Sequence, residues 1–501
     1  DLSARATSTL RPLAQPDRLV APATMSAVGR AAGAIGSSRH EHSPTNAVDT
    51  GEGRRAAAES GTGNSAATEN VGATNTPTPP RPRVIDLLRK YTPKFISWYR
   101  VPQQVRSVLS KILLCRTSVL KGHVYKCPEC HSRCNVYNSC TDRHCPQCHG
   151  ARRADWLEKT RQLLLRGVNY FQVVFTLPDR FSPLILGNRQ ALYDLLFRSA
   201  WRSLDEALRE TGKFHPAALM LLHTWNQELD HHPHLHAVVP GGGPSLEGES
   251  WITSHHPTQR NRRKPYLVDN VLLGRTFRKK FADGFRRLVR SGKLRLEGDW
   301  AKLREPKQLE AWLAEVTQSD WNVFIEGPPH GRSNPDQLLK YLARYLTGGP
   351  ICNGRILDDE NGHVTFWARS KNKAAGNRSR PFTLSGREFV RRWSMHILPK
   401  GYTRSRCFGG YHGRQRKDYL NRCRELLTIP DSPPIEPPEV IKPSPPTCPR
   451  CDIEMDCIEK QRRPSWKEVF HRGIYANPTI YSPMLHCRSA GFPATAHEPY
   501  G

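Results

Sequence analysis

The chain has 501 residues, with 75 Lys and Arg against 46 Asp and Glu, and a formal net charge of +29. A basic excess of this size indicates a polyanionic partner rather than a particular fold. The mean hydropathy is −0.61, and the absence of any run of about 18 apolar residues excludes a transmembrane helix. The N-terminus lacks the pattern of a secretory signal, so we expect a cytoplasmic protein.

Residues 1–80 are rich in Ala, Thr, Ser, Gly, Pro and Asn and hold seven Arg against seven acidic residues. Such a segment buries too little apolar area to offset the loss of chain entropy on folding. We therefore predict a disordered extension over residues 1–82. The whole basic excess then belongs to the rest of the chain.

From Val84 onward, apolar residues recur at helical spacing, with interruptions at Pro93 and Pro102. This pattern predicts short helices that lead into a cluster of cysteines. We interpret residues 83–160 as a helical and zinc-binding domain.

Two C-x-x-C pairs lie in this region, separated by fourteen residues. Together they can offer four thiolates to one tetrahedral zinc ion, with no open position for water, which is typical of a structural site. Free buried cysteines or a redox pair are the alternatives. Neighbouring Cys and His residues leave a different ligand set or a second ion open. The predicted ligands are Cys127, Cys130, Cys145 and Cys148, and the neighbours are Cys115, Cys134, Cys140, His131 and His144.

The segment HPHLHAVVPGGG places His234 and His236 two residues apart in an apolar run. Side chains at this spacing share one face of a strand, so both imidazoles can bind one divalent ion while Leu235 packs on the other face. The preceding strand and turn supply Gln227 or His223 as a third ligand. The alternative is a pair of ordinary strand histidines.

The segment DQLLKYLARYLTGG, residues 336–349, predicts an amphipathic helix that ends at two glycines. Tyr341 and Tyr345 are spaced i, i+4, so their hydroxyls share one face, with Lys340 and Arg344 beside them. Core packing of the two rings is the alternative. A phenol can also act as a nucleophile if a metal or cation polarises its electrophile.

Residues 366–425 hold sixteen Lys and Arg against three acidic residues, with aromatic residues interleaved. This pattern favours a path for single-stranded DNA, with phosphates on cations and bases on rings. A solvated surface with ordinary core aromatics is the alternative. The interleaved aromatics are Phe366, Trp367, Tyr402, Phe408 and Tyr411. The cations that we predict to contact DNA are Lys340, Arg344, Arg369, Lys371, Arg391, Arg392, Lys400, Arg404 and Arg406.

Residues 428–501 begin with a Pro-rich linker and continue into CPRCDIEMDC. Cys448 and Cys451 resemble a zinc knuckle without an evident second pair, and unpaired cysteines are the alternative. The loose candidates for partners are Cys457, His471, His486 and Cys487.

Several of these segments, in this order, resemble the HUH endonuclease superfamily, and within it the two-tyrosine rolling-circle transposases of the insertion-sequence-ninety-one type. The matching stretches are YNSCTDRHCPQCHG, YFQVVFTLP, HTWNQELDHHPHLHAVVPGGG, KYLARYLTGG and HILPKGYTRSRCFGG. The resemblance implies an HUH nuclease domain over residues 161–427, of α+β class, with a central antiparallel sheet and the tyrosine helix laid against the metal site. We expect strands near 170–177, 219–225, 234–239 and 322–326.

The resemblance further implies that His234 and His236 hold Mg²⁺ or Mn²⁺, and that Tyr341 or Tyr345 attacks single-stranded DNA to leave a 5′-phosphotyrosine link. The expected protein is a bacterial, nucleoid-associated transposase. A plasmid replication initiator or relaxase shares this chemistry and remains an alternative, as does an inactive zinc-finger DNA-binding protein.

Overall fold

The structure is a computed structural model, and it describes residues 81–148, 156–256, 258, 265–327, 348–369, 379–428 and 444–471. Several predictions concern residues outside these ranges. They are the disordered extension as far as residue 80, the tyrosine helix with Lys340, Tyr341, Arg344 and Tyr345, and the cation Lys371.

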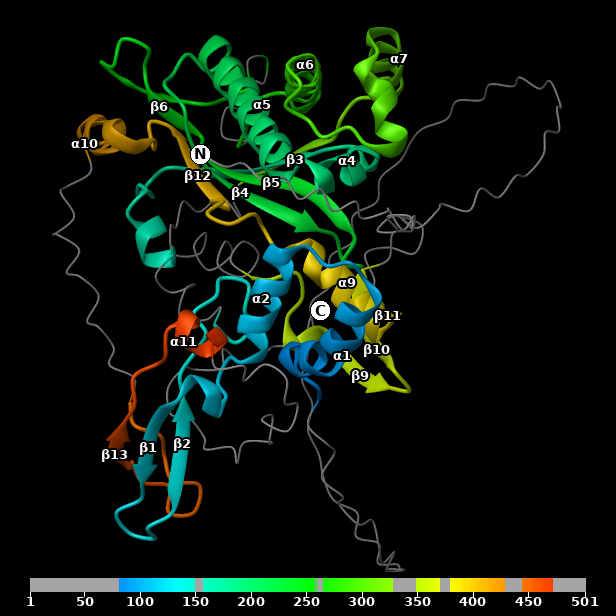
Figure 1. The fold of residues 1–501 in the computed structure, drawn as a ribbon. Helices are drawn as coiled ribbons and strands as arrows, with labels where there is room; N and C mark the ends of the chain where they lie inside the picture. Colours follow the sequence, from blue (N-terminus) through cyan, green and yellow to red (C-terminus); the bar gives the residue numbers. More distant parts are fainter. Residues whose placement is uncertain are drawn as a thin grey trace, which may run out of the picture. The chain divides into compact units, whose positions relative to one another are not determined.

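A five-stranded antiparallel sheet forms the centre of the fold, with the strand order β12-β4-β5-β3-β8 (Figure 1). All four predicted strands are present, and the α+β prediction is confirmed. The bounds are β3 (Tyr170–Thr176), β4 (Ala217–Trp225), β5 (His231–Pro240), β8 (Val323–Glu326) and β12 (Ser405–Gly409).

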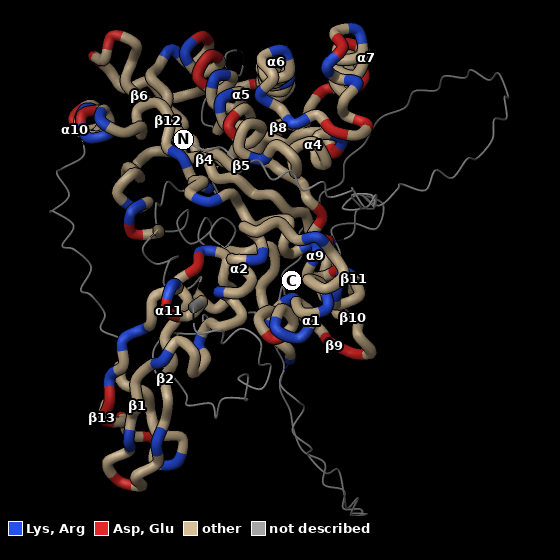
Figure 2. Tube along the Cα trace, in the orientation of Figure 1, with Lys and Arg blue, Asp and Glu red and all other residues tan. Residues whose placement is uncertain are grey.

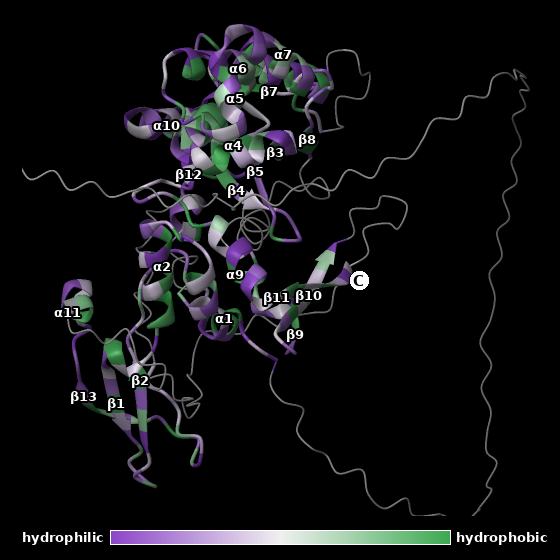
Figure 3. Ribbon diagram, turned by 45° about the vertical axis from the view of Figure 1, so that its right-hand side comes forward, coloured by the Kyte–Doolittle hydropathy of each residue, from purple (hydrophilic) through white to green (hydrophobic). Residues whose placement is uncertain are grey.

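Two long helices, α5 (Arg189–Glu210) and α6 (Asn270–Arg290), cover one face of this sheet. Leu235 and Ala237 of β5 point into the resulting core, where they meet aromatic side chains such as Phe277. In Figure 3 the hydrophobic residues gather where these helices meet the sheet. Because strand side chains alternate, the even-numbered residues of β5, including both predicted ligands, lie on the opposite face.

A second core lies between α1 (Val84–Trp98), α2 (Gln103–Leu113), α9 (Gly386–Met395) and a three-stranded sheet of order β11-β10-β9. The expected interruption at Pro93 is wrong, because α1 continues through it. Proline inside a helix removes one hydrogen bond, but the packing of Leu88, Tyr91 and Phe95 into this core holds the helix together. The strands are β9 (Ile356–Glu360), β10 (His363–Arg369) and β11 (Ser379–Ser385).

A third sheet joins the two ends of the described chain. The hairpin β1 (Gly122–Lys126) and β2 (Arg133–Tyr137) is extended by β13 (Asp456–Lys460), which pairs antiparallel with β1. The remaining elements are α4 (Ser182–Gly187), β6 (Gly242–Pro244), β7 (Trp251–Thr253), α7 (Pro306–Val316), α10 (Arg416–Leu426) and α11 (Trp466–His471). None of the helices in the described ranges has both the length and the apolar composition needed to cross a bilayer. The predicted domain boundaries stay predictions.

Candidate metal centre and cysteine clusters

Three histidines converge on the face of the sheet opposite α5 and α6. In the register of β4 with β5, His223 lies directly across from His234, and His236 is one step along the same face. The ring centroids are 5.5 Å apart for His223 and His234, 4.5 Å for His223 and His236, and 5.0 Å for His234 and His236. One ligand nitrogen from each ring lies within 4.8 Å of the others, so the three can hold one ion.

The second nitrogen of two of these rings is already engaged. His234 Nδ1 lies 2.8 Å from the backbone carbonyl of His232, to which it can donate, and this leaves Nε2 for a metal. His236 Nδ1 lies 2.8 Å from the Gln172 side-chain amide. Gln172 carries no recognisable signal in the sequence. Its position on β3, across from the histidine strand, becomes evident only in the sheet register.

Two of the three rings, those of His234 and His236, are suited to bind a metal as neutral imidazoles. Burial, followed by the charge of His236, lowers the pKa of His234 to about 3. Burial, followed by the charge of Arg404, lowers the pKa of His236 to about 4. At neutral pH both rings are therefore uncharged and keep a lone pair for coordination.

Arg404 connects the histidine group to the end of the predicted tyrosine segment. Its Nε donates to the Leu222 carbonyl at 3.1 Å, and its Nη1 donates to the Gly348 carbonyl at 2.9 Å. The guanidinium lies 4.8 Å from the ring centre of Trp225, which in turn stacks on His223 at 4.8 Å. Burial, followed by the charge of Arg143, lowers the pKa of Arg404 to about 10, so it stays cationic at neutral pH.

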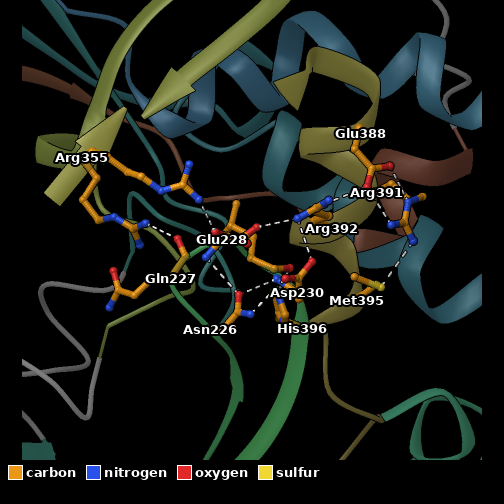
Figure 4. A network of polar contacts seen from close by, with 12 residues as sticks. Asn226, Gln227, Glu228, Asp230, Arg355, Glu388, Arg391, Arg392, Met395 and His396 are labelled. Atoms are coloured by element: carbon orange, nitrogen blue, oxygen red, sulfur yellow. Dashed lines mark hydrogen bonds and ion pairs between the residues drawn. The ribbon is translucent and has the colours of Figure 1, made fainter. Parts of the chain in front are cut away.

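The turn between β4 and β5 is fastened by polar contacts with the second core (Figure 4). Asn226 Oδ1 accepts from the backbone amides of Glu228 and Asp230 at 3.0 and 2.9 Å. Gln227, one of the two predicted third ligands, is exposed, and its carbonyl accepts from Arg355. The three-imidazole group forms without it. Figure 4 shows the Arg392 guanidinium directed at Asp230, with an N–O distance of 2.7 Å.

Most of the predicted DNA-contacting cations that are described have structural partners. Arg391 and Arg392 pair with Glu388 at 2.6 and 2.8 Å, and Arg406 pairs with Asp194 of α5 at 2.6 Å. Arg369 and Lys400 are exposed. In Figure 2, Lys and Arg are spread over many elements rather than confined to residues 366–425.

The aromatic residues in this stretch are mainly core residues, which corrects the interpretation of all five as base-stacking groups. Phe366, Tyr402 and Tyr411 are buried, and Phe408 stacks on Trp201 of α5 with centroids 5.5 Å apart. Trp367 remains exposed at 38% of its surface. The alternation of cations and rings therefore comes from strands and helices with one buried face.

The expected single four-cysteine site is wrong, because the two C-x-x-C pairs belong to different clusters. Cys145 and Cys148 join Cys115 and Cys140, and all four are buried. The Cys148 sulfur lies 3.6 Å from that of Cys115 and 3.7 Å from that of Cys140. The turn that follows α2 supplies Cys115, which the linear spacing had indicated only as a neighbour.

Cys127 and Cys130 instead meet Cys448 and Cys451 from the C-terminal segment. The predicted knuckle at residues 448–451 thus has a second pair, at the other end of the chain. Of the loose candidates, Cys457 lies outside this cluster, whereas His486, Cys487 and the side chain of His471 are not among the described residues. Sequence spacing could not show this pairing, because β13 brings the pairs together only when it adds to β1.

A hollow of about 640 Å³ lies beside the first cysteine cluster. Its lining includes the cations Lys111, Arg143 and Lys400 and the amides of Gln103 and Gln104. Of these residues, only Lys400 is among the cations predicted from the sequence to contact DNA. The Arg143 guanidinium donates to the Pro399 carbonyl at 2.9 Å, which connects the cysteine loop to the segment that leads into β12.

Comparison with known proteins identifies the family. A family described as "Putative transposase" matches residues 217–418, and one described as "Transposase zinc-binding domain", of the IS91 type, matches residues 87–177. A "Putative transposase y4qJ" from Sinorhizobium fredii is 37% identical over 364 residues, which are 71% of this chain and 86% of the relative. The chain belongs to this transposase family.

A second relative is the "Transposase for insertion sequence element IS801" from Pseudomonas savastanoi pv. phaseolicola. It is 29% identical over 333 residues, which are 64% of this chain and 73% of the relative. No solved structure matches the chain at a significant level. The transposase match contains all three histidines, and the zinc-binding match contains the whole first cysteine cluster. A transposase acts on DNA, so DNA is the polyanionic partner that the large basic excess indicates.

Proposed function

We propose that this transposase nicks single-stranded DNA in a metal-dependent reaction and transfers the strand through a 5′-phosphotyrosine intermediate, as in rolling-circle transposition. The observation that carries the proposal is the connection that Arg404 makes between the three-histidine group and Gly348. Tyr345 is three residues before Gly348, and three residues of chain span at most about 11 Å. By this limit of chain length, the Cα atom of Tyr345 is within about 11 Å of Gly348, whose carbonyl accepts the hydrogen bond from Arg404.

Either Tyr341 or Tyr345 would act as the nucleophile. Its oxygen forms a bond to phosphorus, the bond from phosphorus to the 3′-oxygen breaks, and the departing oxygen takes a proton to become a 3′-hydroxyl. The diester energy is kept in the tyrosine link, so a 3′-hydroxyl can later attack that link and rejoin strands without ATP. A second tyrosine lets the protein cut another strand while the first is still occupied.

The residues fit a divalent cation with three imidazole ligands. When bound, the cation would withdraw charge from the scissile phosphate. Three nitrogen ligands suit Mn²⁺ better than Mg²⁺, which prefers oxygen. We therefore propose Mn²⁺ as the better activator at His223, His234 and His236, with Gln172 and the His232 carbonyl holding two of the rings in position.

The first cysteine cluster is proposed as a structural zinc site. Four buried thiols within 4.8 Å of one another provide a complete tetrahedral ligand set and leave no position for a reacting water. The cluster would hold the loop that carries Arg143 and His144 against residues 398–402, since Leu398 N donates to His144 Nε2 at 3.1 Å. The cationic hollow beside it is a suitable path for the DNA strand.

The test is formation of a covalent adduct. The protein is incubated with Mn²⁺ and 3′-labelled single-stranded DNA from the flanks of its gene, and SDS-resistant product is counted. The intact protein and a Tyr137→Phe control should form the adduct, whereas Tyr341→Phe combined with Tyr345→Phe should not. An adduct in the double variant would refute the tyrosine assignment. No adduct in the intact protein would refute the nickase proposal and favour a DNA-binding protein without activity.

A further inference from the structure

The second cysteine cluster consists of two turns with matching backbone geometry. In the first turn, Cys127 N donates to the Ser132 carbonyl at 2.9 Å, and His131 N donates to the Cys127 carbonyl at 3.1 Å. His131 has a φ of 57°, which places it in the left-handed region. The two thiols of this turn therefore sit on a tight loop at the end of the β1–β2 hairpin.

The tail repeats this arrangement at the same offsets. Cys448 N donates to the Ile453 carbonyl at 2.8 Å, Asp452 N donates to the Cys448 carbonyl at 2.9 Å, and Asp452 has a φ of 55°. Two knuckles of this kind, facing each other, are the usual framework for a four-thiolate zinc ion. Their agreement is independent of the distances between the sulfurs.

The four sulfurs also converge. They lie within 4.8 Å of one another, and those of Cys130 and Cys448 are 3.5 Å apart although 318 residues separate them in sequence. Cys127 and Cys448 are buried, and Met455 packs beside them in a small apolar cluster. Four thiols gathered in this way are suited to a thiophilic ion such as zinc.

We propose that Cys127, Cys130, Cys448 and Cys451 bind a second structural zinc ion, which fastens the C-terminal segment to the N-terminal hairpin. The zinc-binding family match ends at residue 177 and so contains only half of this ligand set. The proposal does not depend on whether the histidine group cuts DNA.

The fastened segment continues toward the first cluster. After β13 pairs with β1, Gln461 N donates to the Gly122 carbonyl at 2.9 Å. The Arg463 guanidinium then donates to the Cys140 carbonyl at 3.1 Å and to Thr141 Oγ1 at 2.9 Å. Val469 of α11 is buried in the second core. Loss of the second zinc should therefore loosen contacts that support the first site.

Zinc counting provides the first test. By elemental mass spectrometry we expect two zinc ions per chain in the purified protein, and one after Cys448→Ser with Cys451→Ser. A Cys457→Ser control, which changes a half-buried thiol outside the cluster, should retain two. One zinc in the unaltered protein would overturn the proposal. So would a disulfide between two of these four cysteines, located by peptide mapping, because it would take the place of the metal site.

Cleavage of the linker provides a second test that needs no cysteine variant. A protease site is inserted between residues 429 and 443, and the cut protein is passed through a sizing column. In reducing buffer, which opens any disulfide at Cys134, the tail should elute with the body of the protein while zinc is bound and separate after treatment with a strong chelator. Separation in the presence of zinc would overturn the proposal. Co-elution of the tail with the body after both zinc ions are removed would also overturn the proposal, because strand pairing alone would then hold the tail.

Discussion

Replacing Arg404 tests whether this residue positions the tyrosine segment or only stabilises the fold. Arg404→Met keeps the length of the side chain but removes two hydrogen bonds and the contact with Trp225. Hydrogen bonds from a charged donor are worth about 1.5–3 kcal/mol each, and the cation–π contact adds roughly 0.5–2 kcal/mol. Removing a buried charge offsets part of this loss, so we expect a net destabilisation of about 2–4 kcal/mol.

The effect on the reaction should be larger than this loss of stability implies. Displacement of a reacting group by about 1 Å can slow a reaction roughly 100-fold, and the variant releases Gly348 from the histidine face. We expect the single-turnover rate of adduct formation to fall about 10- to 100-fold, at saturating Mn²⁺ and under conditions where the variant stays folded. Arg404→Lys should also be slow, because a lysine cannot make both hydrogen bonds.

The matched control is Arg406→Met, which breaks the ion pair with Asp194 on the α5 side of the sheet. Stability is measured by urea unfolding and the rate by counting adducts in quenched samples. Arg406→Met should be destabilised but react at nearly the normal rate once corrected for folded protein. If both variants slow the reaction equally after that correction, Arg404 has only a structural role and the positioning argument is wrong.

Three further outcomes follow from the structure. His223→Ala removes one of the three proposed ligands, so the Mn²⁺ affinity measured by calorimetry should fall at least about 10- to 100-fold. Loss of a group that only supports a metal ligand already has an effect of this size. An unchanged affinity would show that His223 is not a ligand. Leu235→Ala opens a cavity beneath the histidine strand, where the side chain is fully buried, and should cost about 2–5 kcal/mol in urea unfolding; a cost near zero would place this side chain outside the core. Deleting residues 1–80 removes no net charge, so DNA affinity and its salt dependence should stay nearly unchanged in a binding titration, whereas a marked loss of either would place DNA contacts in that extension.

Local patterns were sufficient for the strands and for two of the three histidines. The alternation of apolar residues in HPHLHAVV places His234 and His236 on one face and Leu235 on the other, because successive side chains of a strand point in opposite directions. The knuckles were also evident from their spacing, because a C-x-x-C turn is a local structure. The basic excess correctly indicated a polyanionic partner, which the transposase family identifies as DNA.

Long-range pairing settled the rest. His223 becomes the third member of the group because the β4–β5 register places it opposite His234, and a shift of one residue would turn it to the other face. Cys127 and Cys130 meet Cys448 and Cys451 because β13 pairs with β1, which no spacing within either segment can indicate. Most of the aromatic side chains among the basic residues 366–411 are also buried, because they pack against segments that are distant in sequence. Local sequence specifies which residues share a face, but only the packing of distant segments decides whether that face meets solvent, a metal or another side chain.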